Sequence, residues 1–486
     1  ADSMSTTFMV FDEDSFIKIK ERVRYILSIG FDNREFGRQF VDVVKDNTTI
    51  SPDHYSTYDL KHGLRNDDGT GVLVGVSGIA SVSGYKMLDD KIIPTEGELR
   101  YRGIRLTDLV ENYFKEDKFG YEETIYLLLS GSLPTKGEMA AFDELLEENR
   151  KLPDSFIENF IINSPSQNVM NNMQRVLLAL YPFDDKAEDR DFENQISQVI
   201  SIIAKMPLIL AYSYIGKKYY YDDASLILHH LEPNMSTAET ILHLIRPDAT
   251  FTDEEAKLLD LCLIIHAEHG GGNNSTFATH VVSSTGTDTY STISTALSSL
   301  KGSKHGGANS MVEAMVQDLK ATTADWTDKD QVEKYLRDIL NKQAFDQSGL
   351  IYGMGHAVYT KSDPRAVLLK DKAKGMAIEK GYCDDFNLLS NIEAITKDLI
   401  NEKRPGSEIC ANVDLYTGLV YRMLGLSPDL YTPIFAVART AGWCAHRLEQ
   451  IQDPKIIRPA YVNISENKAY LAMEDRQSKH SQLAIK

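Results

Sequence analysis

The most constraining feature of this sequence is a series of helix signals that begins after residue 105. Thr252 followed by Glu255 forms a capping box, in which the two side chains satisfy backbone N–H groups at a helix start. Leu258, Cys262 and Ile265 then fall on one face of "TDEEAKLLDLCLIIHAEH", as in an amphipathic helix. The pattern predicts a chain that is mainly α-helical.

Other segments refine this expectation. Ser236 and Glu239 repeat the capping box before "TILHLIRP", where Pro247 ends the helix. Residues 72–103 instead carry β-branched residues and turn glycines, which predict a few short strands. Two amphipathic runs, "FIKIKERVRYILS" and "FGRQFVDVVKD", predict a helical extension over residues 1–60. The fold class is therefore mainly α with a short N-terminal β element.

Charge and apolar patterning exclude several partners. The formal charge is −19 with a pI near 5.1, whereas nucleic acid and anionic membranes reward clustered Lys and Arg. An anionic ligand must then be held by local arginines. The most apolar stretch, "VISIIAKMPLILAYSYIG", is interrupted by Lys205 and Pro207, so we expect no membrane span.

The cysteines and the first residues bear on the compartment. Four cysteines without metal-ligand spacing are too few for a disulfide framework and favour a reducing compartment. The stretch "ADSMSTTFMVFDEDSF" is acidic and has neither a secretory nor a mitochondrial signal pattern. We therefore expect a cytoplasmic protein.

Two glycine-rich segments place histidines where helices end or begin. In "HAEHGGGNN", residues 266–274, His269 falls on the same helical face as Leu258, Cys262 and Ile265, so we expect it to point inward where the helix stops. Alone, this is typical of a glycine cap with a core histidine, and His266 with His269 does not complete a metal motif. In "GSKHGGANSMVEAMVQDLK", His305 precedes a helix whose dipole disfavours a second positive charge. We expect His305 to be a neutral hydrogen-bond donor, although a plain loop also fits.

Three further candidates are charged. "YGMGHAVYTKSDPR" sets His356 nine residues before Arg365, which falls in the first turn of a helix and needs an anion, either a ligand or Asp363. Asp414 in "NVDLYTG" lies at a helix start, as an N-cap or as a carboxylate kept ionised by the dipole. Arg439 interrupts an apolar run, so it needs a counter-charge if buried.

Together these segments resemble the citrate synthase family, of the si type, across roughly residues 65–465. The matching stretches are "HAEHGGGN", "GSKHGGAN", "GMGHAVYTKSDPR", "NVDLYTG", "FAVARTAGW" and "IIRP". The resemblance implies a mainly helical two-domain homodimer that condenses acetyl-CoA with oxaloacetate and hydrolyses citryl-CoA. It implies a large domain of residues 61–308 plus 420–486 and a small domain of residues 309–419.

The resemblance also implies roles by motif position. His305, His356 and Asp414 would be catalytic, and the residues expected to bind oxaloacetate are His269, Arg365, Arg439 and Arg458, the last from the neighbouring subunit. CoA contacts would come from Gly353, Met354, Gly355 and Lys361. No tightly bound cofactor and no metal are expected. Position 360, often basic in the family, is Thr360 here, and Met354 stands where some members carry an aromatic residue.

Elementary acid–base chemistry agrees with a catalytic role shared by Asp414, His305 and His356. A thioester α-proton has a pKa of roughly 20 against ~4 for Asp, so transfer to Asp414 alone is uphill by roughly 22 kcal/mol. A neutral donor at His305 would stabilise the enol, and one at His356 would polarise the ketone. Alternatives are a 2-methylcitrate synthase using propionyl-CoA, a zinc hydrolase built on His266, His269 and His280, and an inactive regulatory relative.

Overall fold

The computed structural model describes residues 35–88 and 91–476. The chain divides into two units, one formed by residues 1–72 with 459–486 and a main unit of residues 73–458. The first unit contains α2 (Glu35–Thr48), α3 (Asp53–Thr57) and the 3-10 turns His62–Leu64 and Met473–Asp475. The run "FGRQFVDVVKD" is thus helical, while "FIKIKERVRYILS" lies outside the described residues.

The β element of the main unit is a three-stranded antiparallel sheet in the order β1 (Ala80–Leu88), β2 (Lys91–Tyr101) and β3 (Ile104–Arg105). The expectation of short strands in residues 72–103 is confirmed. Glycines let another backbone approach this sheet. A Cβ at Gly84 would lie 2.5 Å from the carbonyl oxygen of Val358, and one at Gly97 would lie 2.1 Å from that of Ser362. The sheet therefore supports the segment that follows His356.

The remainder of the main unit is helical. Its α-helices are α4 (Leu106–Lys115), α5 (Tyr121–Ser130), α6 (Lys136–Asn149), α7 (Val169–Ala179), α8 (Phe192–Tyr221), α9 (Thr237–Ile245), α10 (Asp253–His266), α11 (Asn274–Ser283), α12 (Thr289–Lys301), α13 (Ala308–Thr322), α14 (Lys329–Leu340), α15 (Pro364–Glu379), α16 (Cys383–Lys403), α17 (Asp414–Met423) and α18 (Tyr431–Gln450). A π-helical turn spans Ile157–Ile162, and 3-10 turns span Tyr181–Phe183 and Pro428–Leu430. Both predicted capping boxes are present, at Ser236 and at Thr252.

Helix α8 differs from the sequence expectation. The sequence predicts that Lys205 and Pro207 break the apolar stretch into pieces too short to span a membrane, yet one helix of 30 residues runs through both positions. Burial against neighbouring helices offsets the lost backbone hydrogen bond, while Lys205 donates to the carbonyl oxygen of Asn149 and to the hydroxyl of Ser201. In the described part of the chain α8 alone is long and apolar enough to cross a membrane, but 78% of its most apolar window is buried in the protein.

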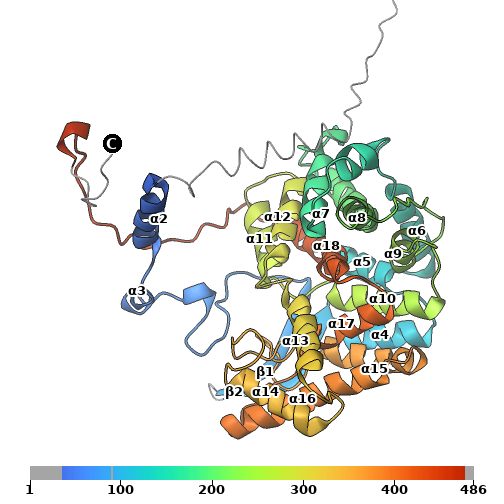
Figure 1. Ribbon diagram of the computed structural model, residues 1–486. Coiled ribbons are helices and arrows are strands. Elements are labelled where there is room, and N and C mark those ends of the chain that lie inside the picture. The colour runs from blue at the N-terminus through green and yellow to red at the C-terminus, as the bar shows by residue number, and fades with distance from the viewer. Residues whose placement is uncertain (1–34, 89–90, 477–486) are drawn as a thin grey trace, which may run out of the picture. The chain divides into compact units, whose positions relative to one another are not determined.

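Helix α18 occupies the middle of the helical core. It packs against α5, α7, α8, α10, α11 and α12, which surround it in Figure 1. Helices α13 to α17 pack mainly on one another, with α15 also touching α4, α10 and β2. The side chains of Arg439, Trp443 and Arg447 on α18 are almost fully buried. Polar groups on α18 are thus held deep in the protein, next to the loops that carry the predicted site.

Candidate active site

His269 lies in the loop between α10 and α11, close to His356. Helix α10 ends at His266, so His269 is three residues past the helix and not on its apolar face as expected. Its Nε2 is 3.2 Å from the hydroxyl of Tyr359, and its ring centroid is 5.1 Å from that of His356. Burial, with Arg365 and His356 nearby, lowers the pKa of His269 well below its usual value. His269 is therefore a neutral imidazole.

His356 has a defined tautomer. Its Nδ1 accepts hydrogen bonds from the backbone N–H groups of Val358 at 3.0 Å and Tyr359 at 3.2 Å. Its ring stacks on Tyr359 with centroids 4.5 Å apart. Because a neutral imidazole carries one proton, that proton is on Nε2. The neutral form of His356 thus presents an N–H donor from a ring fixed on its other side.

The loop before His356 is tied to the segment before α17. The amide of Gly355 donates to Cys410, the amide of Asn412 donates to Gly353, and Met354 forms a β-bridge with Ala411. Gly353 has a φ of +83°, and a Cβ there would lie 2.9 Å from the Leu415 side chain. A glycine is needed at this close approach. These bonds couple the position of His356 to that of Asp414.

Asp414 is the first residue of α17. Val413 occupies the N-cap position, so Asp414 does not act as the cap. Burial raises the pKa of Asp414 to about 6, while Arg365 opposes the rise and Asp363 adds to it. The sequence predicts a carboxylate kept ionised by the helix dipole, whereas burial raises the pKa, so desolvation is the larger effect on its basicity. The carboxylate is ionised above about pH 6 and is a stronger base than an exposed aspartate.

Arg365 is buried in the first turn of α15 and paired internally. Its Nε and Nη2 donate to the two oxygens of Asp363 at 3.0 and 2.7 Å, and both side chains are almost fully enclosed. Burial would lower the pKa of Arg365, but the Asp363 carboxylate raises it above the usual value. Asp363 also caps α15 through the Arg365 amide and accepts from the Val413 amide at 3.3 Å. The pairing with Asp363 is present, but in the interior and not at the surface.

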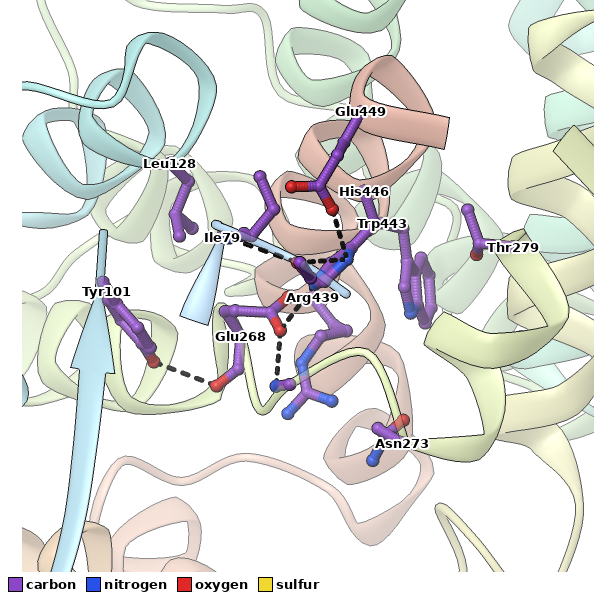
Figure 2. Close-up of polar contacts among 12 residues, drawn as sticks. Ile79, Tyr101, Leu128, Glu268, Asn273, Thr279, Arg439, Trp443, His446 and Glu449 are labelled. Atoms are coloured by element: carbon purple, nitrogen blue, oxygen red, sulfur yellow. Dashed lines mark hydrogen bonds and ion pairs between the residues drawn. The ribbon is translucent and has the colours of Figure 1, made fainter. Parts of the chain in front are cut away.

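Arg439 is a fully buried arginine whose terminal nitrogens make no hydrogen bond. Its Nε donates to the carbonyl oxygen of His266 at 2.6 Å, and its guanidinium lies over the ring of Phe435 at 4.7 Å. Nη1 and Nη2 are buried without a hydrogen-bond partner. Burial lowers the pKa of Arg439 to about 10, with Glu268 opposing that effect. Figure 2 shows the guanidinium beside Glu268, with its terminal nitrogens pointing away from α18.

His305 lies just before α13. A Cβ at the adjacent Gly306 would meet the carbonyl oxygen of Leu300 at 2.3 Å, so the loop is tightly packed. His305 Nε2 is 3.0 Å from the hydroxyl of Ser275, which also accepts from Trp443 Nε1 at 3.1 Å. Burial, with Arg439 nearby, lowers the pKa of His305 to about 4. The prediction of a neutral His305 agrees with this value, but burial is the main cause.

The structure connects six predicted residues and leaves two others apart. In addition to burial, the charges of Arg365 and Arg439 and the nearby His356 lower the pKa of His269. Arg365 also opposes the rise in the pKa of Asp414, and Arg439 adds to the lowering of the pKa of His305. Lys361 is exposed and lies 3.8 Å from Glu408, and Thr360 has a buried hydroxyl without a hydrogen-bond partner. Arg458 is exposed and makes no hydrogen bond or ion pair within the described residues.

Several residues of the site are not predicted from the sequence. Ser275 and Tyr359 contact the predicted histidines, and Trp443 donates to Ser275, yet each resembles an ordinary core residue in a helix or a loop. Glu268 carries no signal of its own, although it precedes His269. The Glu268 carboxylate fits beside α18 only because residue 442 is a glycine. A Cβ at Gly442 would lie 2.2 Å from Glu268 Oε2. Only the packing of distant segments identifies these residues.

The site therefore combines neutral imidazoles, one carboxylate with a raised pKa and two buried guanidinium groups. Such a set can bind a small dianion, accept a proton and donate hydrogen bonds to oxygens that become negative. In the zinc alternative His280 would join His266 and His269. In the described part of the chain, the His280 side chain instead groups with His446 and Glu449.

Comparisons with known proteins agree with this arrangement. Residues 69–460 match the family model described as "Citrate synthase, C-terminal domain". The chain is 31% identical over 408 residues to a citrate synthase from Synechocystis, covering 82% of this chain and 93% of the relative. It is 31% identical over 384 residues to a 2-methylcitrate synthase from Shewanella oneidensis, covering 76% and 90%.

A solved structure shows the same fold. It is the ternary complex of citrate synthase from Thermoplasma acidophilum with carboxymethyl coenzyme A and oxaloacetate, with a TM-score of 0.68 and 27% identity. The match covers 85% of this chain and 99% of that one. The mainly helical fold predicted from the sequence is thereby confirmed. The chain belongs to the citrate synthase family of acyltransferases.

Proposed function

We propose that this enzyme condenses acetyl-CoA with oxaloacetate and hydrolyses the resulting citryl-CoA to citrate and CoA. The observation that carries the proposal is Arg439, whose two terminal nitrogens are buried without hydrogen bonds. A dry guanidinium left unpaired is costly, and a planar carboxylate is the group that satisfies it in a bidentate manner. His269 and Arg365 lie close enough to act electrostatically on this region and would hold the rest of the dianion.

Enol formation is assigned to Asp414 and His305. Even with a pKa of about 6 at Asp414, proton transfer from a carbon acid of pKa roughly 20 is uphill by about 19 kcal/mol. A donor at the thioester oxygen must therefore stabilise the developing charge while Asp414 takes the proton. His305, held neutral by burial, is that donor.

Ser275 is proposed to select which nitrogen of His305 donates, by giving its proton to His305 Nε2 and not to Asn273 Oδ1. Trp443 Nε1 donates to the Ser275 oxygen, so that oxygen keeps its own proton to give to His305 Nε2 at 3.0 Å or to Asn273 Oδ1 at 2.9 Å. When Ser275 donates to Nε2, the proton of His305 resides on Nδ1. Nδ1 then faces the thioester as a hydrogen-bond donor. Ser275 is a positioning residue in this scheme.

His356 is assigned to the ketone of oxaloacetate. Its Nδ1 accepts two backbone hydrogen bonds, so the donor is Nε2–H. A donor at the ketone oxygen makes the carbonyl carbon more electrophilic as the enol forms. The rigid loop around Gly353 and Gly355 would hold this donor in place, and that loop together with Met354 and Lys361 is proposed to contact CoA.

A second copy of the chain is proposed to complete each site through Arg458. This arginine is exposed and unpaired within the described residues. Large apolar side chains that follow it in the sequence, and others in residues 73–76, are exposed as well. Leu73, Val76 and Tyr461 are 95%, 98% and 94% exposed, which is unusual unless another surface covers them. No tightly bound cofactor is invoked. The four cysteines are free thiols, which supports a reducing compartment such as the cytoplasm.

Propionyl-CoA is the alternative acyl donor, favoured by the likeness to the 2-methylcitrate synthase from Shewanella oneidensis. The same residues would act on either thioester. Release of the CoA thiol in the presence of oxaloacetate tests both readings, and we expect a higher kcat/KM with acetyl-CoA than with propionyl-CoA. A higher value with propionyl-CoA would reassign the substrate, and no thiol release with either would overturn the proposed function.

A further inference from the structure

Behind the candidate site, two histidines from different helices face each other. His280 Nε2 on α11 and His446 Nδ1 on α18 are 2.9 Å apart. The outer nitrogens of both rings are engaged, because His446 Nε2 bonds to Glu268 Oε1 at 2.9 Å and His280 Nδ1 bonds to Gln450 Oε1 at 2.8 Å. A carboxylate and an amide oxygen only accept, so both outer nitrogens carry the protons of neutral rings. With Gln450 in this orientation two lone pairs face each other, and a cation between them would stabilise the pair; the Ser77 hydroxyl also lies 3.5 Å from His446 Nδ1.

A carboxylate lies beside the two lone pairs. Glu449 Oε2 is 3.9 Å from His446 Nδ1 and is buried without a hydrogen-bond partner. Its other oxygen is held by the amide of Gly78 at 2.7 Å, which fixes the direction of the carboxylate. The three ligand atoms lie within 4.8 Å of one another. Figure 2 shows Glu449 reaching toward His446 from the next turn of α18.

The absence of a side chain at residue 271 leaves one side of the pair open. A Cβ at Gly271 would lie 3.6 Å from His280 Nε2 and 4.0 Å from His446 Nδ1. Ligand nitrogens around a tetrahedral zinc ion, bound at about 2.0–2.1 Å, are roughly 3.3 Å apart. The two rings therefore need to separate by only a few tenths of an ångström, on the order of ordinary side-chain adjustment.

We propose that His280 Nε2, His446 Nδ1 and Glu449 Oε2 bind one divalent transition-metal ion of the zinc class. Two imidazoles and a carboxylate are ligands that suit such ions and not Mg²⁺ or Ca²⁺, which prefer all-oxygen sites. Glu268 and Gln450 complete the arrangement as the acceptors that fix the tautomer and orientation of the ligating rings. The sequence predicts no metal site, because 166 residues separate the two histidines.

The ion would join three parts of the fold next to the candidate active site. It bridges α11 to α18, and Glu449 extends the link to the segment before β1 through Gly78. Glu268, which orients His446, immediately precedes His269. An ion that binds the folded state and not the unfolded chain stabilises the fold by mass action. We therefore expect zinc to raise the unfolding temperature as well as to bind.

The test uses untagged full-length protein, stripped with a chelator and titrated with Zn²⁺ against a chromophoric competitor. We expect one ion per chain and a higher unfolding temperature on loading. His280→Gln and Glu449→Gln should each weaken binding by at least about tenfold, as loss of one ligand predicts. His230→Gln, which removes an exposed histidine outside the cluster, should bind like the unmutated protein.

A second measurement needs no variant. X-ray absorption at the zinc edge of the loaded protein should give two imidazole ligands, with oxygen as the other ligand type. Coordination without imidazole would overturn the proposal, as would the absence of stoichiometric binding. Unchanged affinity in both His280→Gln and Glu449→Gln would do the same. Any of these results would leave a proton as the cation shared by the two rings.

Discussion

Arg439 and Arg447 lie two turns apart on α18 and are both buried, but only Arg447 has its hydrogen bonds satisfied. The Arg447 guanidinium donates to five groups, on Thr289, Ser283, Thr292, Gln195 and Thr287. Arg439 donates one bond from Nε, and its two terminal nitrogens make none. Arg447 therefore stabilises the fold, whereas the terminal nitrogens of Arg439 are available to bind a ligand.

This contrast predicts different effects of the same substitution. Arg439→Met should weaken oxaloacetate binding at least 100-fold, about 2.7 kcal/mol. It should lower the unfolding temperature of the free enzyme less than Arg447→Met does, because Arg439 donates one hydrogen bond and Arg447 donates five. Arg447→Met should lower the free energy of unfolding by roughly 1–3 kcal/mol for each buried acceptor that it leaves without a donor. Calorimetry with oxaloacetate and thermal unfolding measure both. Equal destabilisation by the two variants would assign Arg439 a structural role.

Asp414 predicts the acid limb of the pH–rate profile. Burial raises the pKa of Asp414 to about 6. Below that pH the carboxylate is protonated and cannot act as a base, so kcat/KM should fall as the pH drops through about 6. Asp414→Asn should nearly abolish condensation and change the Kd of oxaloacetate by less than about threefold. A variant with near-normal turnover, or an acid limb close to pH 4, would contradict this role.

Ser275 predicts a split between kcat and KM. Ser275→Ala removes the hydroxyl that is proposed to select the tautomer of His305. We expect kcat to fall by about 100-fold, a typical share for a positioned proton donor. The KM for oxaloacetate should change little, because the arginines that bind it are intact. Ser310→Ala, at an exposed position on α13, is the matched control. Equal losses in kcat and in oxaloacetate binding would point to general disruption of the site.

His356 predicts a spectroscopic change. A donor at the ketone lengthens the C=O bond, so bound oxaloacetate should show a carbonyl infrared band shifted to lower frequency than free oxaloacetate. His356→Ala should reduce that shift, because it removes the Nε2–H donor whose orientation the Val358 and Tyr359 amides fix. An undiminished shift in the variant would show that another group polarises the ketone.

How much the sequence predicts depends on the range of the interaction. The capping boxes at Ser236 and Thr252 are correct because each is decided within four residues. The continuation of α8 through Pro207 is not predicted, because tertiary burial overrides the local preference of proline. The cause of the raised pKa at Asp414 is not predicted either, since desolvation depends on the packed surroundings.

In the candidate site, too, the residues in local motifs are predicted from the sequence and the contacts between distant segments are not. His269, His305, His356 and Asp414 are identified through the order of family motifs, which is written along the chain. The side chains around them are not identified, because Ser275 meets Trp443 across 168 residues, and the pair behind the site, His280 and His446, meets across 166. Nothing in the periodicity of either helix marks those contacts. Long-range pairs of this kind require coordinates.

The last prediction concerns coupling between the two substrates. Arg365 on α15 and Arg439 on α18 belong to the predicted small and large domains, and both would hold oxaloacetate. A ligand that contacts both parts favours the arrangement in which they are close, since it binds that state more tightly. We therefore expect oxaloacetate to lower the Kd of acetyl-CoA by about tenfold or more, roughly 1.4 kcal/mol of coupling.

Arg365→Leu should weaken the binding of oxaloacetate and also remove this coupling, because oxaloacetate would no longer be held by the arginine on α15. Asp363 complicates the choice of variant, since its carboxylate loses its partner when Arg365 is replaced. Arg365→Leu combined with Asp363→Asn is therefore the better variant for comparison, because it removes the buried pair without leaving a charge. Titration of an unreactive acetyl-CoA analogue, with and without saturating oxaloacetate, measures the coupling. Equal affinities in the unmutated enzyme would rule out substrate-driven closure, and coupling that persists in the double variant would move the bridge from Arg365 to another residue.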